Sequence, residues 1–252
     1  MSFAAIVLPN GEKIVNSYVG DQPNGAPDTK IARFAGVLWI LMSISGAFSQ
    51  IFVRGSLIVP GNISATANNI RSAELLFRFG FVCDLTMMLL LPATAMVLYK
   101  LLYAANRNRA ALMVLLAALG AALGMLNCLN ELLALRLLGG SEYLNAFSPD
   151  QLQAQAMLYL QTYEDGYAIA EVFFMLWVLP LGMLVYKSGF LPRIFGVLFF
   201  CETAFGLAGS FTHFLFPSAG IHDLLLIPGA CAEISFMLWL AIKGIKKNKQ
   251  SH

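Results

Sequence analysis

The sequence predicts an all-α fold: a polytopic membrane bundle of six transmembrane helices with the N- and C-termini in the cytoplasm. Of the 252 residues, 58% are hydrophobic and 12% charged, and the mean hydropathy is +0.71. A soluble domain of this length would need roughly twice that charged fraction to cover its surface. Long apolar runs and a one-sided distribution of basic residues complete the prediction.

Six predominantly apolar stretches of about 20 residues or more can each cross a hydrocarbon core of roughly 30 Å. They cover residues 33–54, 74–103, 109–138, 166–187, 193–216 and 222–242. Polar or turn-rich segments separate them. We therefore expect a polar cytoplasmic tail over 1–30, a six-helix transmembrane domain over 31–245 and a basic cytoplasmic tail over 246–252.

The orientation follows from the basic residues, because Lys and Arg in short loops stay on the cytoplasmic side. With the N-terminus inside, that side receives Lys13, Lys30, Arg33, Lys100, Arg107, Arg109, Lys187, Arg193, Lys243, Lys246, Lys247 and Lys249. The opposite side receives only Arg54, Arg71, Arg78 and Arg136. The predicted partner of the chain is the lipid bilayer.

Several classes of function receive no support from the sequence. The formal charge of +2 and the lack of a basic stripe argue against a nucleic-acid partner. The four cysteines lie far apart in apolar runs, so we expect packed thiols and neither a disulfide framework nor a zinc site. No HExxH, GxSxG, P-loop or CxxCH pattern occurs, and the cofactor, if any, is unknown.

Two external segments look structured. One follows Pro60, and the other opens at Ser148, where Pro149 suits the first helical position and Gln151 completes a capping box. Apolar residues continue at helical spacing from Leu152 to Tyr163. This second segment is predicted to be an interfacial helix that lies on the bundle, with ordinary loop packing as the alternative.

Ionisable side chains within a span cost several kcal/mol unless they face the bundle interior, so they are candidate functional residues. In the last two spans such residues follow single stripes with the spacing i, i+4, i+7 and i+11. One stripe comprises Glu202, Gly206, Gly209 and His213, and the other comprises His222, Leu226, Gly229 and Glu233. A short connection would bring the histidines to one outer level and the glutamates about 16 Å deeper.

The third span carries a related stripe that turns polar at its outer end and comprises Gly120, Gly124, Asn127 and Glu131. If the three stripes converge, they form an outer polar layer above a deeper pair of carboxylates, Glu202 and Glu233. The outer layer would then comprise His213, His222, Asp223 and Glu131, together with Arg78 or Glu171.

Such a layer suits several kinds of chemistry. His213, His222 and Asp223 are candidate ligands for Zn²⁺ or another divalent metal with an open position for a hydrolytic water. The deeper carboxylate pair suits proton relay or cation transfer. Binding of a polar ligand, a haem held by the two histidines, and hydrogen bonding that merely joins helices are the alternatives.

The second span contains two charged residues with different expected partners. Arg78 follows Glu74 by four residues, so the sequence predicts an ion pair between them at the outer end of the span. Asp84 lies deeper and about 120° around the helix from Arg78, so it needs a different partner.

Several short motifs along the membrane region resemble those of a bacterial family catalogued as domain of unknown function 4386. They comprise Ala32-Arg33-Phe34-Ala35-Gly36, Asn69-Ile70, Glu74-Leu75-Leu76-Phe77-Arg78, Asp84, Asn106-Arg107, Tyr143-Leu144, Phe147, Gln151, Gly166, Phe173-Phe174, Ser188-Gly189-Phe190-Leu191-Pro192-Arg193, Glu233 and Leu238-Trp239-Leu240. The resemblance implies a multi-pass protein of a bacterial inner membrane but no reaction or cofactor. Arg78, Asp84 and Glu233 match its pattern, whereas Glu202 and His213 do not.

We therefore predict an outward-facing polar pocket that binds or transports a small solute, ion or lipid-like ligand. The candidate ligand- or proton-binding residues are Arg78, Asp84, Asn127, Glu131, Glu171, Glu202 and Glu233. The alternatives are an intramembrane metal-dependent hydrolase and a structural or immunity-type membrane protein without catalysis.

Overall fold

The computed structural model describes residues 28–140, 142–216 and 220–245, and for Tyr143 and Asp223 it describes the backbone alone. Within these residues all regular secondary structure is helical, and six helical runs are long and apolar enough to cross a membrane. The predicted all-α, multi-pass membrane bundle is thereby confirmed. The predicted tails at 1–30 and 246–252 lie outside the described residues, apart from residues 28–30.

The six runs follow the predicted order. The first joins α1 (Thr29–Ala47), the π-helix η1 (Phe48–Arg54) and α2 (Gly55–Leu57), and the second is α4 (Glu74–Leu102). The third joins α5 (Arg107–Asn127) and α6 (Leu129–Leu138), and the remaining three are α7 (Pro149–Lys187), α8 (Arg193–Leu215) and α9 (His222–Ile242). Two short helices, α3 (Ile63–Ser72) and η2 (Glu142–Leu144), join the spans at one end of the bundle.

Local capping explains where several helices begin. The side chains of Asp28 and Asn106 accept hydrogen bonds from backbone N–H groups in the first turns of α1 and α5. At the start of α7, Ser148 and Gln151 form the predicted capping box. Each cap satisfies a backbone donor that a helix N-terminus otherwise leaves without a partner.

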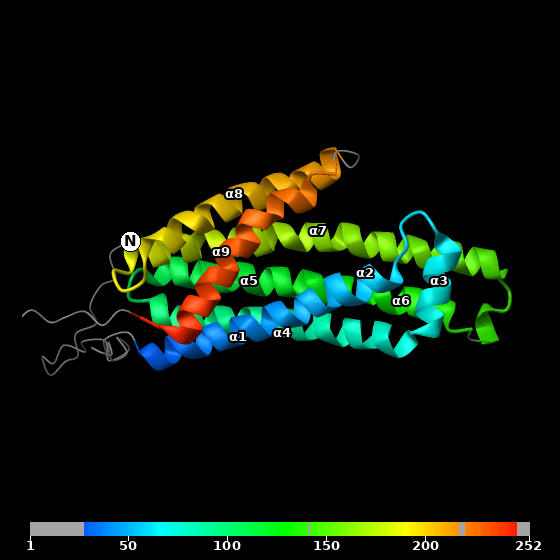
Figure 1. The fold of residues 1–252 in the computed structure, drawn as a ribbon, viewed down its shortest axis with the longest axis horizontal. Helices are drawn as coiled ribbons and strands as arrows, with labels where there is room; N and C mark the ends of the chain where they lie inside the picture. The colour runs from blue at the N-terminus through cyan, green and yellow to red at the C-terminus, as the bar shows by residue number, and fades with distance from the viewer. Residues whose placement is uncertain (1–27, 141, 217–219, 246–252) are drawn as a thin grey trace, which may run out of the picture.

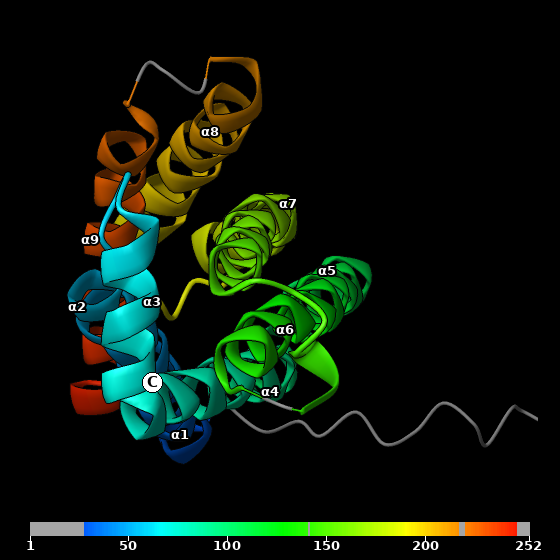
Figure 2. The ribbon, with the colours of Figure 1, turned by 90° about the vertical axis from the view of Figure 1, so that its right-hand side faces the viewer.

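The six spans form a ring in which α1, α4, α5, α7, α8 and α9 pack in that order and α9 returns to α1 (Figure 2). Glycines allow two of these helix pairs to approach closely. A Cβ on Gly36 would lie 2.5 Å from the backbone nitrogen of Ala241, and one on Gly196 would lie 2.8 Å from the carbonyl oxygen of Gly182. The helix α1 begins, and α9 ends, at what we call the terminal end of the ring; α3 marks the distal end (Figure 1).

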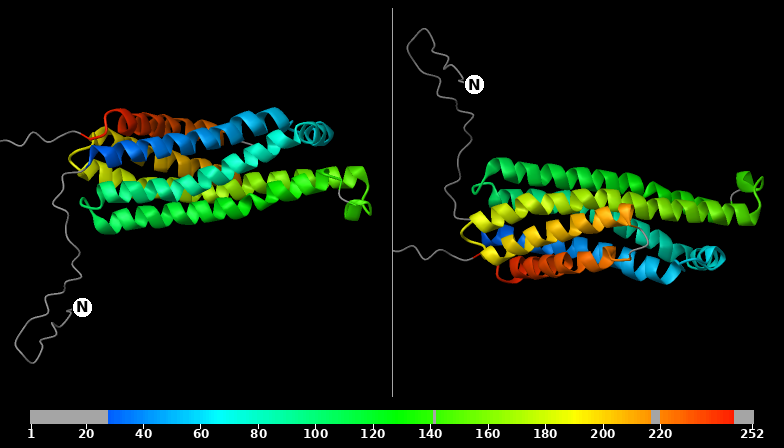
Figure 3. Two further views of the ribbon diagram at one scale, coloured as in Figure 1. Left: turned by 90° about the horizontal axis from the view of Figure 1, so that it is seen from below. Right: turned by 90° about the horizontal axis from the view of Figure 1, so that it is seen from above.

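The helices differ in length, and this gives the bundle an asymmetric distal end. The helix α7 has 39 residues, whereas α8 has 23 and α9 has 21. At 1.5 Å per residue α7 is about 58 Å long and α8 about 35 Å. Figures 1 and 3 show α8 and α9 covering only the half of α7 nearest the terminal end.

The predicted interfacial helix at 148–163 is wrong as a separate element, because this segment is the N-terminal part of α7. Its apolar face packs into the distal core, where Ala156 and Leu160 are buried with residues of α3 and α6. Gly166, which separates the segment from the predicted span, lies inside the helix against Asn127. A glycine inside a helix costs about 1 kcal/mol relative to alanine, and the packing of residues on both sides of Gly166 outweighs this cost and keeps the helix continuous.

The membrane-facing surface and the core are both apolar, as lipid solvation allows. Exposed side chains include Ile51, which is 76% exposed, and Leu215, which is 68% exposed. Cys201 and Cys231 also lie on this surface, so the expectation of packed thiols is wrong for them. The terminal half of the core contains an aromatic cluster formed by Trp39, Trp177, Phe195, Phe199 and Phe236.

Candidate functional site

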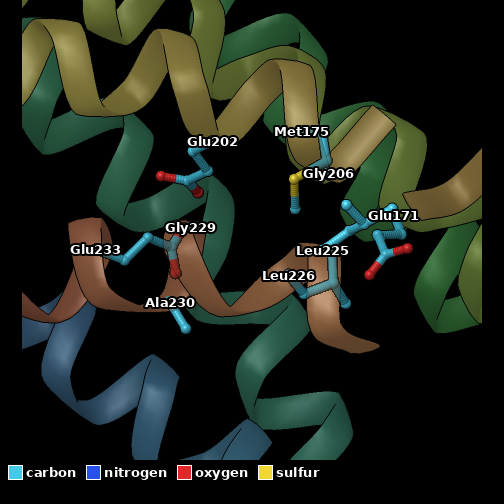
Figure 4. A pocket seen from close by; sticks show the side chains of 9 residues that line it. All are labelled: Glu171, Met175, Glu202, Gly206, Leu225, Leu226, Gly229, Ala230 and Glu233. Atoms are coloured by element: carbon cyan, nitrogen blue, oxygen red, sulfur yellow. The ribbon is translucent and has the colours of Figure 1, made fainter. Parts of the chain in front are cut away.

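A cavity of about 150 Å³ lies between α7, α8 and α9 in the membrane-spanning part of the bundle. We call it the glutamate cavity, because Glu171, Glu202 and Glu233 line it from three different helices (Figure 4). Its other lining residues are small or apolar: Met175, Gly206, Leu225, Leu226, Gly229 and Ala230. No Lys or Arg is among them.

The spacing of the two predicted stripes explains how this cavity forms. Gly206 and Gly229 lie one turn from Glu202 and Glu233 on the facing sides of α8 and α9. A Cβ on Gly229 would lie 2.7 Å from Cγ of Glu202, and one on Gly206 would collide with the sulfur of Met175. The structure therefore brings the two stripes together, with Gly229 leaving room for Glu202 and Gly206 leaving room for Met175.

Glu202 and Glu233 form a carboxyl pair about 14 Å from the terminal ends of their helices, at 1.5 Å per residue. Both side chains line the glutamate cavity, and Glu202 is only 2% exposed. Among the described residues, no N–H or O–H group donates to the buried Oε2 of Glu202. An ionised carboxylate only accepts hydrogen bonds, so a hydrogen bond between the two groups would require a proton on one of them.

Glu171 has a different environment on the distal side of this pair. Its Oε2 accepts a hydrogen bond from Oγ of Ser210 at 2.9 Å and lies 2.9 Å from Nε2 of His222. The ring of His222 lies 5.5 Å from the ring of His213, whose Nε2 is 3.1 Å from Oδ1 of Asp165. These residues form a polar ladder from the cavity to the surface, because the side chain of Asp165 is 65% exposed.

The ladder uses both candidate metal-binding histidines in contacts with carboxylates. Among the described side chains, no group of three or more His, Cys, Asp or Glu residues is arranged to hold a metal ion. The side chain of Asp223, the third candidate ligand, lies outside the described residues. The geometry of the described residues therefore gives the metal hypothesis no support, and it stays a prediction.

A second polar cluster, the ion triad of Arg54, Asp84 and Glu131, lies near the distal end of the spans. Nη2 of Arg54 is 2.5 Å from Oδ2 of Asp84 and 2.7 Å from Oε1 of Glu131, and all three side chains are buried. The guanidinium lies 4.1 Å from the centre of the Tyr163 ring, whose hydroxyl donates to Asp84 at 3.2 Å. Together with Tyr163 on α7, the triad thus joins the first four spans.

The π-helical turn η1 orients Arg54 towards this triad. In a π-helix, residues five apart are bonded neighbours, and Nη1 of Arg54 donates to Oγ of Ser49, five residues earlier. Both side chains are buried. The distribution of Lys and Arg predicts only that Arg54 lies at the outer end of a span, and the helical position of Asp84 predicts only that its partner is not Arg78.

The predicted single outer layer is wrong for Glu131, which lies in the ion triad with Arg54 rather than beside the histidines. Helical periodicity gives the face on which Glu131 lies but not the order of the helices around the ring. In that order, the third span neighbours the second and fourth. The missing information was therefore the position of the helix rather than the orientation of the side chain.

The two remaining candidates have separate contacts. Arg78 forms the predicted ion pair with Glu74, with Nη2 and Oε1 2.7 Å apart. It also lines a distal cavity of about 270 Å³ with Glu74, Leu132, Leu135, Arg136 and Gly139. Asn127 donates from Nδ2 to the carbonyl oxygen of Tyr163 at 2.8 Å and so links α5 to α7. Neither residue lines the glutamate cavity.

The aromatic cluster lies next to the carboxyl pair on the side of the terminal end. Phe199 precedes Glu202 by three residues on α8, and Phe236 follows Glu233 by three on α9. Their ring centres are 5.0 Å apart, and the ring of Trp39 lies 6.3 Å from that of Phe199 and 5.7 Å from that of Phe236. These packed rings separate the glutamate cavity from the terminal end of the bundle.

Comparisons with known proteins give a family but no activity. The family model described as "Domain of unknown function (DUF4386)" matches residues 34–244. The searches of curated proteins and of solved structures found no match. Since the match covers most of the sequence and nearly all of the six spans, the chain belongs to the DUF4386 family, and it is a multi-pass membrane protein.

Proposed function

We propose that this protein binds a small monovalent organic cation in the glutamate cavity and carries it across the membrane. The observation that supports this most strongly is the charge of the cavity. Three glutamates line it and no Lys or Arg does. A carboxylate in the membrane interior costs several kcal/mol without a partner, and a bound cation lowers that cost.

The charge of the surrounding sequence supports the same ligand class. From Pro149 to Tyr186 and from Ile194 to Ile242 the chain contains no Lys or Arg. The charged residues of these two stretches are all acidic: Asp150, Glu164, Asp165, Glu171, Glu202, Asp223 and Glu233. An anionic solute would meet only repulsion here, apart from the histidines.

The volume and the lining residues of the glutamate cavity restrict the class of ligand further. A cavity of about 150 Å³ can hold a molecule of about six non-hydrogen atoms, such as benzene. Its apolar residues, among them Met175 and Leu225, suit the hydrocarbon part of a small ammonium ion. A lipid molecule is much larger than this space, so the cavity favours the small-solute class over the lipid-like one.

The surroundings also suit a pocket that opens on one side. The polar ladder leads towards the exposed Asp165 at the distal side, and the aromatic cluster closes the terminal side. Transporters of alternating access have a central site that is open to one side at a time. Under the orientation predicted from the Lys and Arg distribution, the open side is the exterior. The proposed location is a bacterial inner membrane, as the family resemblance implies.

Binding of cyclopentylammonium to the purified protein, measured by calorimetry, tests the proposal. This probe has six non-hydrogen atoms, and cyclopentanol is a neutral analogue of similar size. We expect saturable binding of cyclopentylammonium, no binding of cyclopentanol, and binding about ten- to a hundredfold weaker in Glu202→Gln. The variant Glu142→Gln makes the same chemical change at an exposed position outside the cavity and should bind as the unmodified chain does. Equal binding of both probes would contradict a cation site.

Uptake of the same ammonium ion into proteoliposomes separates transport from binding alone. We expect saturable accumulation that disappears in Glu202→Gln and persists in Glu142→Gln. Binding without any uptake would reduce the proposal to a cation-binding membrane protein.

A further inference from the structure

The carboxyl pair in the glutamate cavity has a property that the cation site alone does not require. Glu202 and Glu233 line one cavity from facing helices, and no N–H or O–H group of the described residues donates to Oε2 of Glu202. Two carboxylates in one small cavity repel each other strongly in a medium of low dielectric constant, and one proton between them removes the repulsion. One shared proton and one negative charge on this pair is therefore the state expected without a bound cation.

The groups that face the pair from its neighbouring helices offer no other positive charge. On α7, the segment between Glu171 and Tyr186 has no titratable side chain, and Glu171 is held by Ser210 and His222. On α1, no titratable residue occurs between Arg33 and Arg54, and Oγ of Ser43 donates to Sδ of Met237 on α9. The remaining titratable residues of α8 and α9 are Arg193, His213, His222, Asp223, Cys201 and Cys231. Of these, Arg193 begins α8 at the terminal end, nine residues from Glu202, and the two cysteines are exposed on the bundle surface.

A monovalent cation bound between the two carboxylates would supply the same charge as the shared proton. The proton and the cation would then compete for one pair of oxygens. Resting on the cation-binding function proposed above, we propose that Glu202 and Glu233 exchange their shared proton for one organic cation, so that the protein is a proton-coupled cation exchanger.

The exchange step balances in atoms and charge. The O–H bond of the protonated carboxyl group breaks, its electron pair stays on the carboxylate oxygen, and the proton leaves to water. The ammonium ion then lies between two carboxylates and donates hydrogen bonds to them. No electron transfer takes place, and the charge of the occupied site equals that of the carboxyl pair holding its one shared proton.

The polar ladder offers the leaving proton a route to the distal surface. His222 lies 2.9 Å from Glu171 at the cavity, and His213 lies 3.1 Å from Asp165 towards solvent. The two histidine rings lie 5.5 Å apart and link these two contacts. Histidine and carboxylate groups are the usual members of such relays in membrane proteins. In the other direction the aromatic cluster provides no titratable group, so release is expected at the distal side in this conformation.

Calorimetric titration with cyclopentylammonium in two buffers of different ionisation enthalpy counts the protons released per cation bound. We expect about one proton per cation for the unmodified chain. We also expect the affinity to weaken about tenfold for each unit that the pH falls while the pair remains protonated, as one-for-one linkage requires. The surface variant Glu142→Gln should give the same proton count and the same pH dependence.

The outcomes distinguish this inference from the function on which it rests. Binding with no proton release and no pH dependence would overturn the exchange but leave the cation site. Absence of binding by any small ammonium ion would overturn both. In Glu233→Gln the amide can donate a hydrogen bond to Glu202 without a shared proton, so any remaining binding should release no proton. Full release from that variant would also overturn the inference.

Discussion

The ion triad and the glutamate cavity both place a pair of carboxyl groups inside the membrane bundle, yet their surroundings differ. Arg54 lies between Asp84 and Glu131 and makes contacts of 2.5 and 2.7 Å with them, and Tyr163 covers its guanidinium. Glu202 and Glu233 have no arginine and adjoin a space of about 150 Å³. A buried acid with an internal counter-ion joins helices, whereas one that lines a cavity without such a counter-ion accepts a cation from outside under the proposed function.

The largest expected effect is on the triad. Replacing Arg54 with Met, which has a long apolar side chain, leaves Asp84 and Glu131 buried without a cation. Removal of one partner from a buried ion pair typically costs about 3–5 kcal/mol. We expect Arg54→Met to lower the unfolding free energy by this amount, measured by reversible denaturation in mixed micelles. A stability loss below about 1 kcal/mol would show that the triad does not hold the spans together.

The second-largest expected effect is on the glutamate cavity, where a substitution should lower the cation affinity rather than the unfolding free energy. Glu202→Gln removes one of two charges that would bind the ammonium ion, and a hydrogen bond to a charged group is worth about 1.5–3 kcal/mol. We expect the affinity for cyclopentylammonium to fall about ten- to a hundredfold. The unfolding free energy should change by less than about 1 kcal/mol, and a loss like that of Arg54→Met would instead indicate a structural role.

A smaller effect is expected from a substitution of Gly229, which lines the glutamate cavity. Gly229→Ala places a Cβ 2.7 Å from Cγ of Glu202, so the glutamate must shift. We expect about a tenfold loss of cation affinity in the same calorimetric titration. The matched control is Gly209→Ala on α8, where the nearest atoms lie at 3.5 Å and a methyl group fits without displacement. Equal losses in both variants would show that helix approach, rather than the position of Glu202, controls binding.

The smallest effect is expected at the exposed pair of Glu74 and Arg78. Their side chains are 45% and 55% exposed, and an exposed i,i+4 pair contributes at most about 0.5 kcal/mol. Arg78→Gln should leave the unfolding free energy and the cation affinity nearly unchanged. A large loss of affinity would mean that the distal cavity, and not the glutamate cavity, takes the ligand.

Sequence patterns predict the parts of this molecule that depend on local spacing. The spans, the capping box at Ser148 and the pair of Glu74 with Arg78 all involve residues close together in sequence. The facing stripes of α8 and α9 also follow from spacing, because a short connection makes these helices antiparallel neighbours. Local periodicity is therefore sufficient for Glu202, Glu233 and the two glycines of the cavity, but not for Glu171.

Other features depend on the order of helices around the ring. Arg54 meets Asp84 and Glu131 across 30 and 77 positions of sequence, and Glu171 meets His222 across 51. Periodicity gives the inward face of each helix but not its neighbours. The π-helical turn at η1 also departs from the 3.6-residue period, so the inward direction of Arg54 could not be read from an α-helical stripe.

Infrared difference spectroscopy of the purified protein tests the central claim most directly, because the C=O stretch of a protonated carboxyl group absorbs apart from that of a carboxylate. Addition of cyclopentylammonium should remove the protonated band of the Glu202–Glu233 pair, and cyclopentanol should not. Glu202→Gln should lack this change, whereas Glu142→Gln should retain it. An unchanged carboxyl band at saturating cyclopentylammonium would contradict a proton-holding cation site at these two glutamates.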